Sequence, residues 1–136
     1  MGIEVFNPTG DLFIIRSIGP LSLDDAHGLA KKMSGIFLSG KRDFCTCVDL
    51  RQCGVVSAPV ADFFLEMLRR DNPLIKYSAF LLSSTDITLG MQVQRMLREA
   101  KNLHRQSFHD SESLFAWLRD ALTHNAQTAL RNYLKE

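Results

Sequence analysis

The chain has 136 residues, of which 46% are hydrophobic and 23% are charged, a composition typical of one soluble globular domain. Its formal net charge at pH 7 is only +1. This argues against a protein that works mainly by neutralising nucleic-acid phosphates, because such domains are usually clearly basic.

The N-terminus and the hydropathy pattern predict a cytoplasmic protein with no membrane span. No apolar run reaches the roughly 18–20 residues that a spanning helix needs. The opening residues lack the basic segment and apolar stretch of a signal peptide. The chain begins Met-Gly, but Phe6 stands where a myristoylation signal requires Ser or Thr.

Three cysteines, Cys45, Cys47 and Cys53, lie close together in the sequence. An odd number of cysteines in a chain of this size fits a reducing compartment better than a disulfide framework. Cys45 and Cys47 are expected to share one face of a strand, without the turn-like spacing of a metal site. We therefore predict buried, unreactive thiols, and we predict no metal and no cofactor.

The first elements form a hairpin and a helix. The segment Ile3–Phe6 is predicted to be a strand, Asn7–Gly10 a turn and Asp11–Gly19 a second strand. A helix is predicted to begin at Ser22, which forms a capping box with Asp25, and to stop near Gly40.

Strands and helices then alternate to the end of the chain. Apolar runs bounded by turn residues predict strands, and apolar residues at helical spacing predict helices. In chain order these are a strand at Phe44–Leu50, a helix from about Ala58 to Arg70, a strand at Ile75–Ser83, a helix capped near Thr85 or Asp86, a short strand at His104–His109, and a helix capped by Asp110 or Ser111.

This order predicts an α/β fold with a single mixed, mostly parallel sheet of four or five strands, flanked by four or five helices. The sequence does not decide which face each helix covers. We expect the domain to span residues 1–122, with residues 123–136 as a helical extension of it. The extension carries apolar residues on one face, which could cover its own sheet or form a homodimer contact; they are Ala126, Leu130, Tyr133 and Leu134.

No catalytic arrangement is visible, so we expect a protein that is not an enzyme. The stretch from Gly35 to Arg42 has the glycine spacing and the lysine of a phosphate-binding loop, but it lacks the final Ser or Thr. It also follows a predicted helix and precedes a strand, which is the reverse of the order that such a loop requires. A helix stop followed by a solvated basic turn explains it.

Ser57 is the residue of most interest, because it stands where an apolar turn becomes a strongly patterned helix. Serine is a favoured N-cap residue, and Pro59 falls in the first helical turn, where proline is tolerated. On this interpretation the Ser57 hydroxyl accepts a hydrogen bond from a backbone amide of the helix. A functional interpretation needs the wider pattern.

The element order, the sequence "VDL" (Val48–Leu50) closing the third strand, and the place of Ser57 together resemble the STAS domain family, the anti-sigma factor antagonists. The resemblance covers the chain from Asp11 to about Leu122. It implies a non-catalytic bacterial regulatory domain that binds a partner protein through the surface around the start of the second helix. The partner would be an anti-sigma factor, a related kinase or another signalling protein, and serine phosphorylation would control the binding.

In phosphorylatable members an Asp-Ser-Ser-Gly-Leu type motif opens this helix, and Ser57 matches its acceptor serine. Val56 stands in place of the aspartate, Ala58 in place of the second serine and Pro59 in place of the glycine. The spacing from Asp49 is about one residue shorter than usual. The resemblance therefore implies a phosphorylation and partner-binding site at Ser57, Asp49, Val56, Ala58 and Pro59, with altered neighbours.

A second resemblance lies at the C-terminal end. Phe108, Phe115, Trp117 and Leu118 are similar to the closing helix of the SpoIIAA-like proteins. This resemblance implies the alternative of a small-molecule or lipid-binding domain, with an apolar pocket between sheet and helices. Core packing between the last strand and the last helix would explain the same residues.

Overall fold

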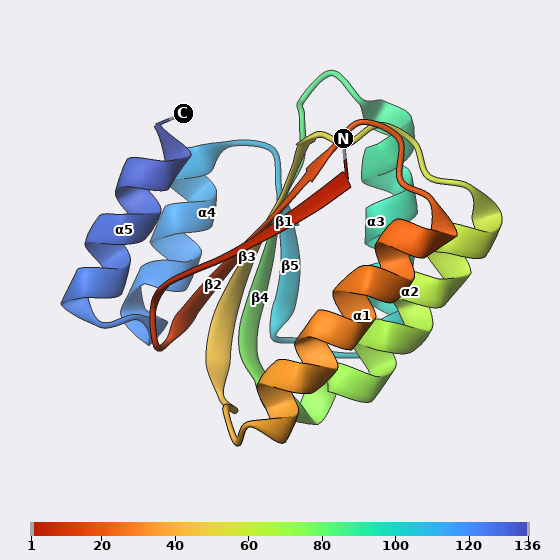
Figure 1. Ribbon diagram of the computed structural model, residues 1–136. Coiled ribbons are helices and arrows are strands. Elements are labelled where there is room, and N and C mark those ends of the chain that lie inside the picture. Colours follow the sequence, from red (N-terminus) through yellow and green to blue (C-terminus); the bar gives the residue numbers. More distant parts are fainter. Residues whose placement is uncertain (1, 136) are drawn as a thin grey trace.

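A mixed five-stranded sheet lies between two layers of helices in the computed structural model, which describes residues 2–135 (Figure 1). The strands follow one another across the sheet in chain order. The first two are antiparallel, and every later neighbour is parallel. The strands are β1 (Gly2–Thr9), β2 (Leu12–Ile18), β3 (Phe44–Gln52), β4 (Ile75–Leu81) and β5 (Arg105–Phe108). The predicted fold class is thereby confirmed.

Three helices cover one face of the sheet and two cover the other (Figure 1). The first layer contains α1 (Leu23–Leu38), α2 (Ala58–Asp71) and α3 (Ile87–Ala100), and the second contains α4 (Ser111–Leu118) and α5 (His124–Leu134). Short 3₁₀ turns, η1 (Asn72–Leu74) and η2 (Arg119–Ala121), follow α2 and α4. Each helix of the first layer joins parallel neighbouring strands, and the right-handedness of such crossovers places all three on one side.

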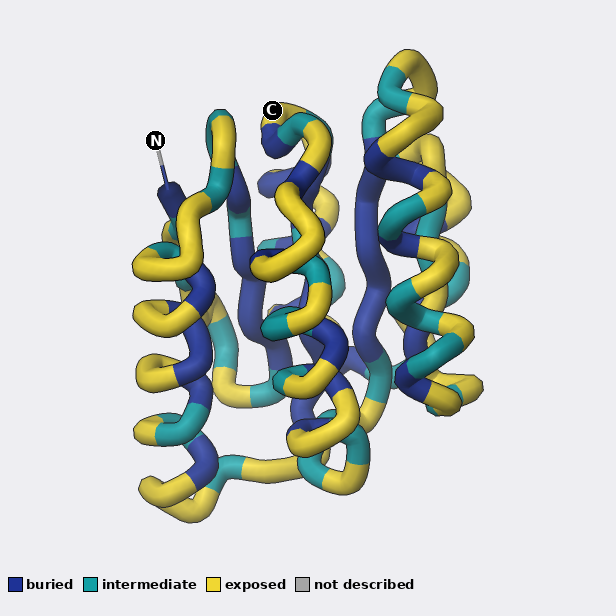
Figure 2. The backbone as a smooth tube through the Cα atoms, turned by 90° about the vertical axis from the view of Figure 1, so that its right-hand side faces the viewer, coloured by how far each residue is buried: buried dark blue, intermediate teal, exposed yellow. Residues whose placement is uncertain are grey.

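Alternation along the strands divides the buried side chains between two cores. Cys45 and Cys47 of β3 face the α4–α5 layer, whereas Phe44 and Leu50 of the same strand face the α1–α3 layer. Figure 2 shows the same division in the α1–α3 layer, where each helix is buried on its sheet side and exposed on the other.

Local capping signals predicted the helix starts well. Ser22 and Asp25 form both hydrogen bonds of the capping box. Asp86 caps α3 and Asp110 caps α4, each through its side chain. Leu23, at the first position of α1, is 40% exposed.

The first strand is longer than predicted. It continues through Asn7 and Pro8 to Thr9, and the turn falls at Gly10 and Asp11. A register shift between Phe6 and Thr9 accommodates the extra residues, and the Asn7 side chain donates to the carbonyl of Leu12 at 2.8 Å. Proline is tolerated here because β1 is an edge strand.

The C-terminal helix packs on its own sheet. Ala126, Leu130, Tyr133 and Leu134 are buried in the α4–α5 core. At the start of α5, the carboxylate of Asp11 accepts hydrogen bonds from the backbone and hydroxyl of Thr123, at 2.8 and 3.2 Å. The segment therefore completes the second helical layer.

Candidate functional site at the start of helix α2

The loop that carries Ser57 lies at the edge where the parallel strands end and α1, α2 and α3 begin, the upper edge in Figure 1. Side chains from several loops meet at this edge in open α/β sheets, which makes it the usual place for binding sites. The loop runs from the end of β3 at Gln52 to the N-cap of α2 at Ser57.

Ser57 is exposed and presents its hydroxyl without using it as a cap. Its backbone is extended (φ −70°, ψ 160°), and its carbonyl accepts from the amide of Ala61 at 2.9 Å. The side chain makes no capping hydrogen bond, which differs from the cap interpretation of the sequence. A capping hydroxyl usually accepts from the second or third helical residue, and the second here is Pro59, which has no N–H.

Val56 is a buried anchor of the loop. Its amide donates to Oε1 of Gln92 at 3.2 Å, and its carbonyl accepts from Nε2 of the same side chain at 2.8 Å. These two bonds attach the Ser57 loop to α3. The role of Gln92 has no signature in the sequence, because it depends on which helix lies beside the loop.

Exposed apolar side chains occur on this loop and on the adjoining end of α3. Val55 is 52% exposed, and Ile87 and Met91, one turn apart on α3, are 74% and 67% exposed. The Gln92 bonds bring this end of α3 beside the loop. Together with Ser57, Ala58 and Pro59, which are also exposed, these side chains are called the Ser57 surface below.

Asp49 lies apart from the Ser57 surface. It is 4% exposed and faces the α4–α5 layer, where its carboxylate accepts from the Tyr133 hydroxyl at 2.6 Å. Arg51 donates to it from Nε at 3.0 Å and from Nη2 at 2.9 Å. Burial alone would raise the pKa of Asp49, but the hydrogen bonds from Arg51 and Tyr133 outweigh it and hold that pKa below its ordinary value. Asp49 therefore fastens the end of α5 to β3.

The aromatic residues of the closing helix pack within the second layer. Trp117 contacts Phe108 with ring centroids 5.5 Å apart, and Leu118 is fully buried. The Arg131 guanidinium of α5 lies 4.5 Å from the Phe115 ring centroid. Packing between β5, α4 and α5 thus accounts for the motif.

The cysteines are buried, as predicted. Burial raises the pKa of Cys45 and Cys53 to about 11, and that of Cys47 to about 12. The thiols are therefore protonated at neutral pH, in the unreactive form.

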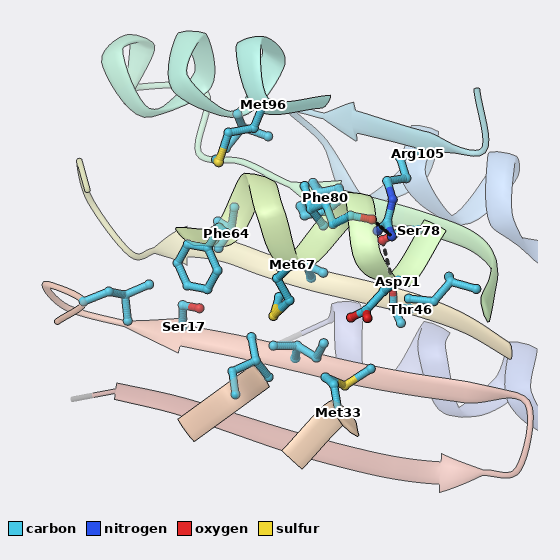
Figure 3. Close-up of a pocket in the computed structure, with 18 residues that line it drawn as sticks. Ser17, Met33, Thr46, Phe64, Met67, Asp71, Ser78, Phe80, Met96 and Arg105 are labelled. Atoms are coloured by element: carbon cyan, nitrogen blue, oxygen red, sulfur yellow. Dashed lines mark hydrogen bonds between the residues drawn. The ribbon is translucent and has the colours of Figure 1, made fainter. Parts of the chain in front are cut away.

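An apolar cavity of about 80 Å³ lies between the sheet and the α1–α3 layer (Figure 3). Met33, Phe64, Met67 and other apolar side chains form most of its wall. This volume exceeds the roughly 10–15 Å³ that a single water molecule requires. The space is therefore large enough for a small apolar group.

Polar side chains gather at one end of this cavity (Figure 3). Thr46 and Ser78 share a hydrogen bond of 2.6 Å. Arg105 donates to Oδ1 of Asn72 at 2.8 Å and to the carbonyl of Leu68 at 3.2 Å. Burial lowers the pKa of Arg105 to about 10, and the nearby Asp71 carboxylate partly opposes this shift. These groups satisfy one another without a ligand.

Within residues 2–135, no helix has the length and apolar character needed to cross a bilayer.

Comparison with known proteins yields fold relatives only. No family model matches the sequence, and no curated protein matches it. A solved structure from Shewanella loihica PV-4, described as an uncharacterized protein of the DUF3478 family with a SpoIIAA-like fold, superposes with a TM-score of 0.62 at 15% identity. That alignment covers 86% of this chain and 92% of the other.

The anti-sigma factor antagonist SpoIIAA, solved in its unphosphorylated form, superposes with a TM-score of 0.55 at 12% identity, over 87% of this chain and 98% of SpoIIAA. At such low identity the likeness speaks for the fold alone. The chain therefore has a SpoIIAA-like fold.

Proposed function

We propose that this protein is a non-catalytic regulatory domain that binds a partner protein through the Ser57 surface, under the control of Ser57 phosphorylation. The observation that carries the proposal is an exposed, uncapped hydroxyl at a helix N-terminus, surrounded by exposed apolar side chains. The likeness to an anti-sigma factor antagonist supports it at the level of the fold.

Phosphorylation at this position changes charge more than shape. A phosphate on Ser57 adds about −1.5 to −2 charges. The amides of Ala58 and Val60 belong to the first helical turn, which leaves its N–H groups without intrahelical partners and favours negative charge. The fold therefore accommodates the phosphate, whereas an apolar partner surface docked on Val55, Ile87 and Met91 loses its fit.

The test begins with a pull-down from the native cell and analysis of the intact mass of the protein for phosphate. Binding of the captured and purified partner is then compared for the wild type, Ser57→Ala and Ser57→Asp. We expect Ser57→Ala to bind normally and Ser57→Asp to bind roughly tenfold more weakly, because it places a charge in an apolar interface. Met91→Asp is expected to behave like Ser57→Asp.

Ser111→Asp is the matched control, because it adds the same charge to the N-terminal turn of α4 in the other layer. Equal binding by Ser57→Asp and the wild type would contradict the proposal. An equal loss for Ser111→Asp would also contradict it, because the effect would then follow net charge and not the Ser57 surface.

The cavity favours a second candidate function, the binding of a small apolar molecule between the sheet and the α1–α3 layer. Its wall is mostly apolar, with polar side chains from Thr46, Asp71, Ser78 and Arg105 at one end and Ser17 away from them. Native mass spectrometry of freshly purified protein tests this function. A co-purified adduct of constant mass is expected, and a clean apo mass over several preparations would exclude the candidate.

A further inference from the structure

The two most exposed large apolar side chains lie at the edge opposite the Ser57 surface. Leu38, at the end of α1, is 88% exposed, and Leu103, between α3 and β5, is 92% exposed. Leu38 ends α1 and Leu103 follows α3, and both helices run back from the Ser57 edge, so both leucines lie at the edge where β3, β4 and β5 begin. Side chains so fully exposed contribute little to the stability of the fold.

Hydrogen bonds join three loop segments into one continuous edge. The amide of Asp43 donates to the carbonyl of Leu74 at 2.9 Å. The Asn72 side chain donates to the carbonyl of Ala100 at 2.7 Å and accepts from Asn102 at 3.2 Å. We call the segments 38–43, 69–76 and 98–104 the basic edge.

The basic edge concentrates positive charge. Its three segments carry seven lysine and arginine residues against three acidic ones, although the whole chain has a net charge of only +1. Ion pairs occupy part of this charge, since Arg70 pairs with Asp71 and Arg69 pairs with Glu66, which lies outside the three segments. Glu99 pairs with Arg95, which also lies outside the segments. The basic residues are Lys41, Arg42, Arg69, Arg70, Lys76, Arg98 and Lys101.

From these observations we propose that the basic edge docks on an anionic lipid surface. Leucines that insert into the interfacial region, flanked by lysines and arginines that meet lipid phosphates, are the usual components of such a contact. Leu38 ends α1 and Leu103 lies between α3 and β5, and neither lines the apolar cavity described above. The combination of exposed leucines with lysines and arginines on one edge favours an anionic membrane over a protein partner.

The test is co-sedimentation of the full chain with vesicles of phosphatidylcholine, with and without phosphatidylserine. We expect binding only to the anionic vesicles, and a loss of binding as the salt concentration rises. The double variant Leu38→Asp/Leu103→Asp is expected to bind roughly tenfold more weakly, because it removes both insertions and adds repulsive charge. Replacing Arg42 and Lys101, which are both exposed, by Glu should weaken binding similarly.

The double variant Ile87→Asp/Met91→Asp is the matched control, since it adds the same charges at two other exposed apolar positions, on the Ser57 surface. Its vesicle binding should remain close to that of the wild type. The proposal would be overturned if the wild type failed to sediment with anionic vesicles at low salt. It would also be overturned if the control variant lost as much vesicle binding as Leu38→Asp/Leu103→Asp. If the basic edge binds an acidic protein and the chain does not bind the vesicles, the edge is a protein interface and the lipid proposal is wrong.

This result is independent of the proposed regulatory function, because partner binding and vesicle binding are separate measurements and the variants expected to lose each one lie on opposite edges of the molecule. The substituted side chains are exposed, so thermal unfolding midpoints should remain near the wild-type value and confirm that each variant is folded.

Discussion

Asp49 illustrates what single residues contribute to this fold. The sequence offers a carboxylate at the end of a strand, and the resemblance places it near the regulatory serine. In the structure it is buried beneath α5, between Arg51 and Tyr133. A buried carboxylate is tolerated only when it is paired and hydrogen-bonded, and Arg51 and Tyr133 provide that pairing for Asp49.

Tyr133→Phe should lower the free energy of unfolding by about 1.5–3 kcal/mol at neutral pH, the range for a hydrogen bond to a charged group. The folded pKa of Asp49 lies below its ordinary value, so its contribution is present above the unfolded pKa of about 3.9 and is lost as pH falls through the folded pKa. The difference between wild type and variant should therefore be constant near neutrality and shrink below about pH 4. Urea unfolding at several pH values measures it.

Tyr77→Phe is the control for this variant, because Tyr77 interacts through its ring, 5.3 Å from that of Trp117. Removing the Tyr77 hydroxyl should change the free energy of unfolding little at any pH. A pH-independent loss in Tyr133→Phe would show that the Asp49 hydrogen bond is not the cause.

Residue-scale prediction succeeded where the cause is local. The Ser22 capping box and the burial of the cysteines follow from residue type and near neighbours in the chain. The anchoring of Val56 by Gln92 joins residues 36 positions apart, and the partnership of Tyr133 with Asp49 spans 84. Neither pair could be recognised before the arrangement of the layers was known.

The elements themselves were largely predictable, and their placement was not. Periodicity located every helix and strand, with errors mainly at ends such as Thr9, where Asn-Pro indicated a turn and a bulged edge strand continues instead. The face that α5 covers was open in the sequence, because an apolar stripe suits either its own sheet or a second copy of the chain.

The structure makes α5 a full part of the α4–α5 core, and this can be measured. Leu130 is fully buried. Leu130→Ala should therefore cost about 2–5 kcal/mol, through lost apolar burial and the cavity that remains. Chemical denaturation with an unchanged denaturant slope would measure the loss directly.

Leu103→Ala makes the same chemical change at a side chain that is 92% exposed, and it should cost nearly nothing. Similar small losses at both positions would mean that α5 is only loosely attached to the sheet.

At the scale of the whole molecule, two helical layers share one sheet, which raises the question of whether they unfold together. The cysteines are distributed between the two cores, since Cys47 lies in the α4–α5 core and Cys53 lies in the α2–α3 core. The fold class followed from element order, but the face that each helix covers did not. An apolar pocket between sheet and helices was an expectation from the resemblance, whereas the residues that line the cavity and the charged edge could not be predicted, because they come from distant parts of the chain.

If the molecule unfolds as one unit, Cys45, Cys47 and Cys53 should react with an excess of thiol reagent at a common rate in the native state. Burial and the raised pKa values suppress direct attack, so the rate should follow global opening and rise equally with denaturant at all three sites. Peptide mapping after timed labelling distinguishes the sites. Earlier labelling of Cys53 alone would instead show that the Ser57 loop opens separately from the rest.

Asp24 and Asp25 lie in the first turn of α1 and Asp86 caps α3, whereas the basic edge lies at the far ends of the same helices. Because acidic residues lie at one end of these helices and basic residues at the other, the molecule has a preferred orientation in an electric field. Near an extended, negatively charged surface, the protein would orient with the basic edge towards that surface and the Ser57 hydroxyl towards the solvent. A kinase or partner protein that approaches from the solvent would then reach Ser57 while the basic edge stays bound to the surface.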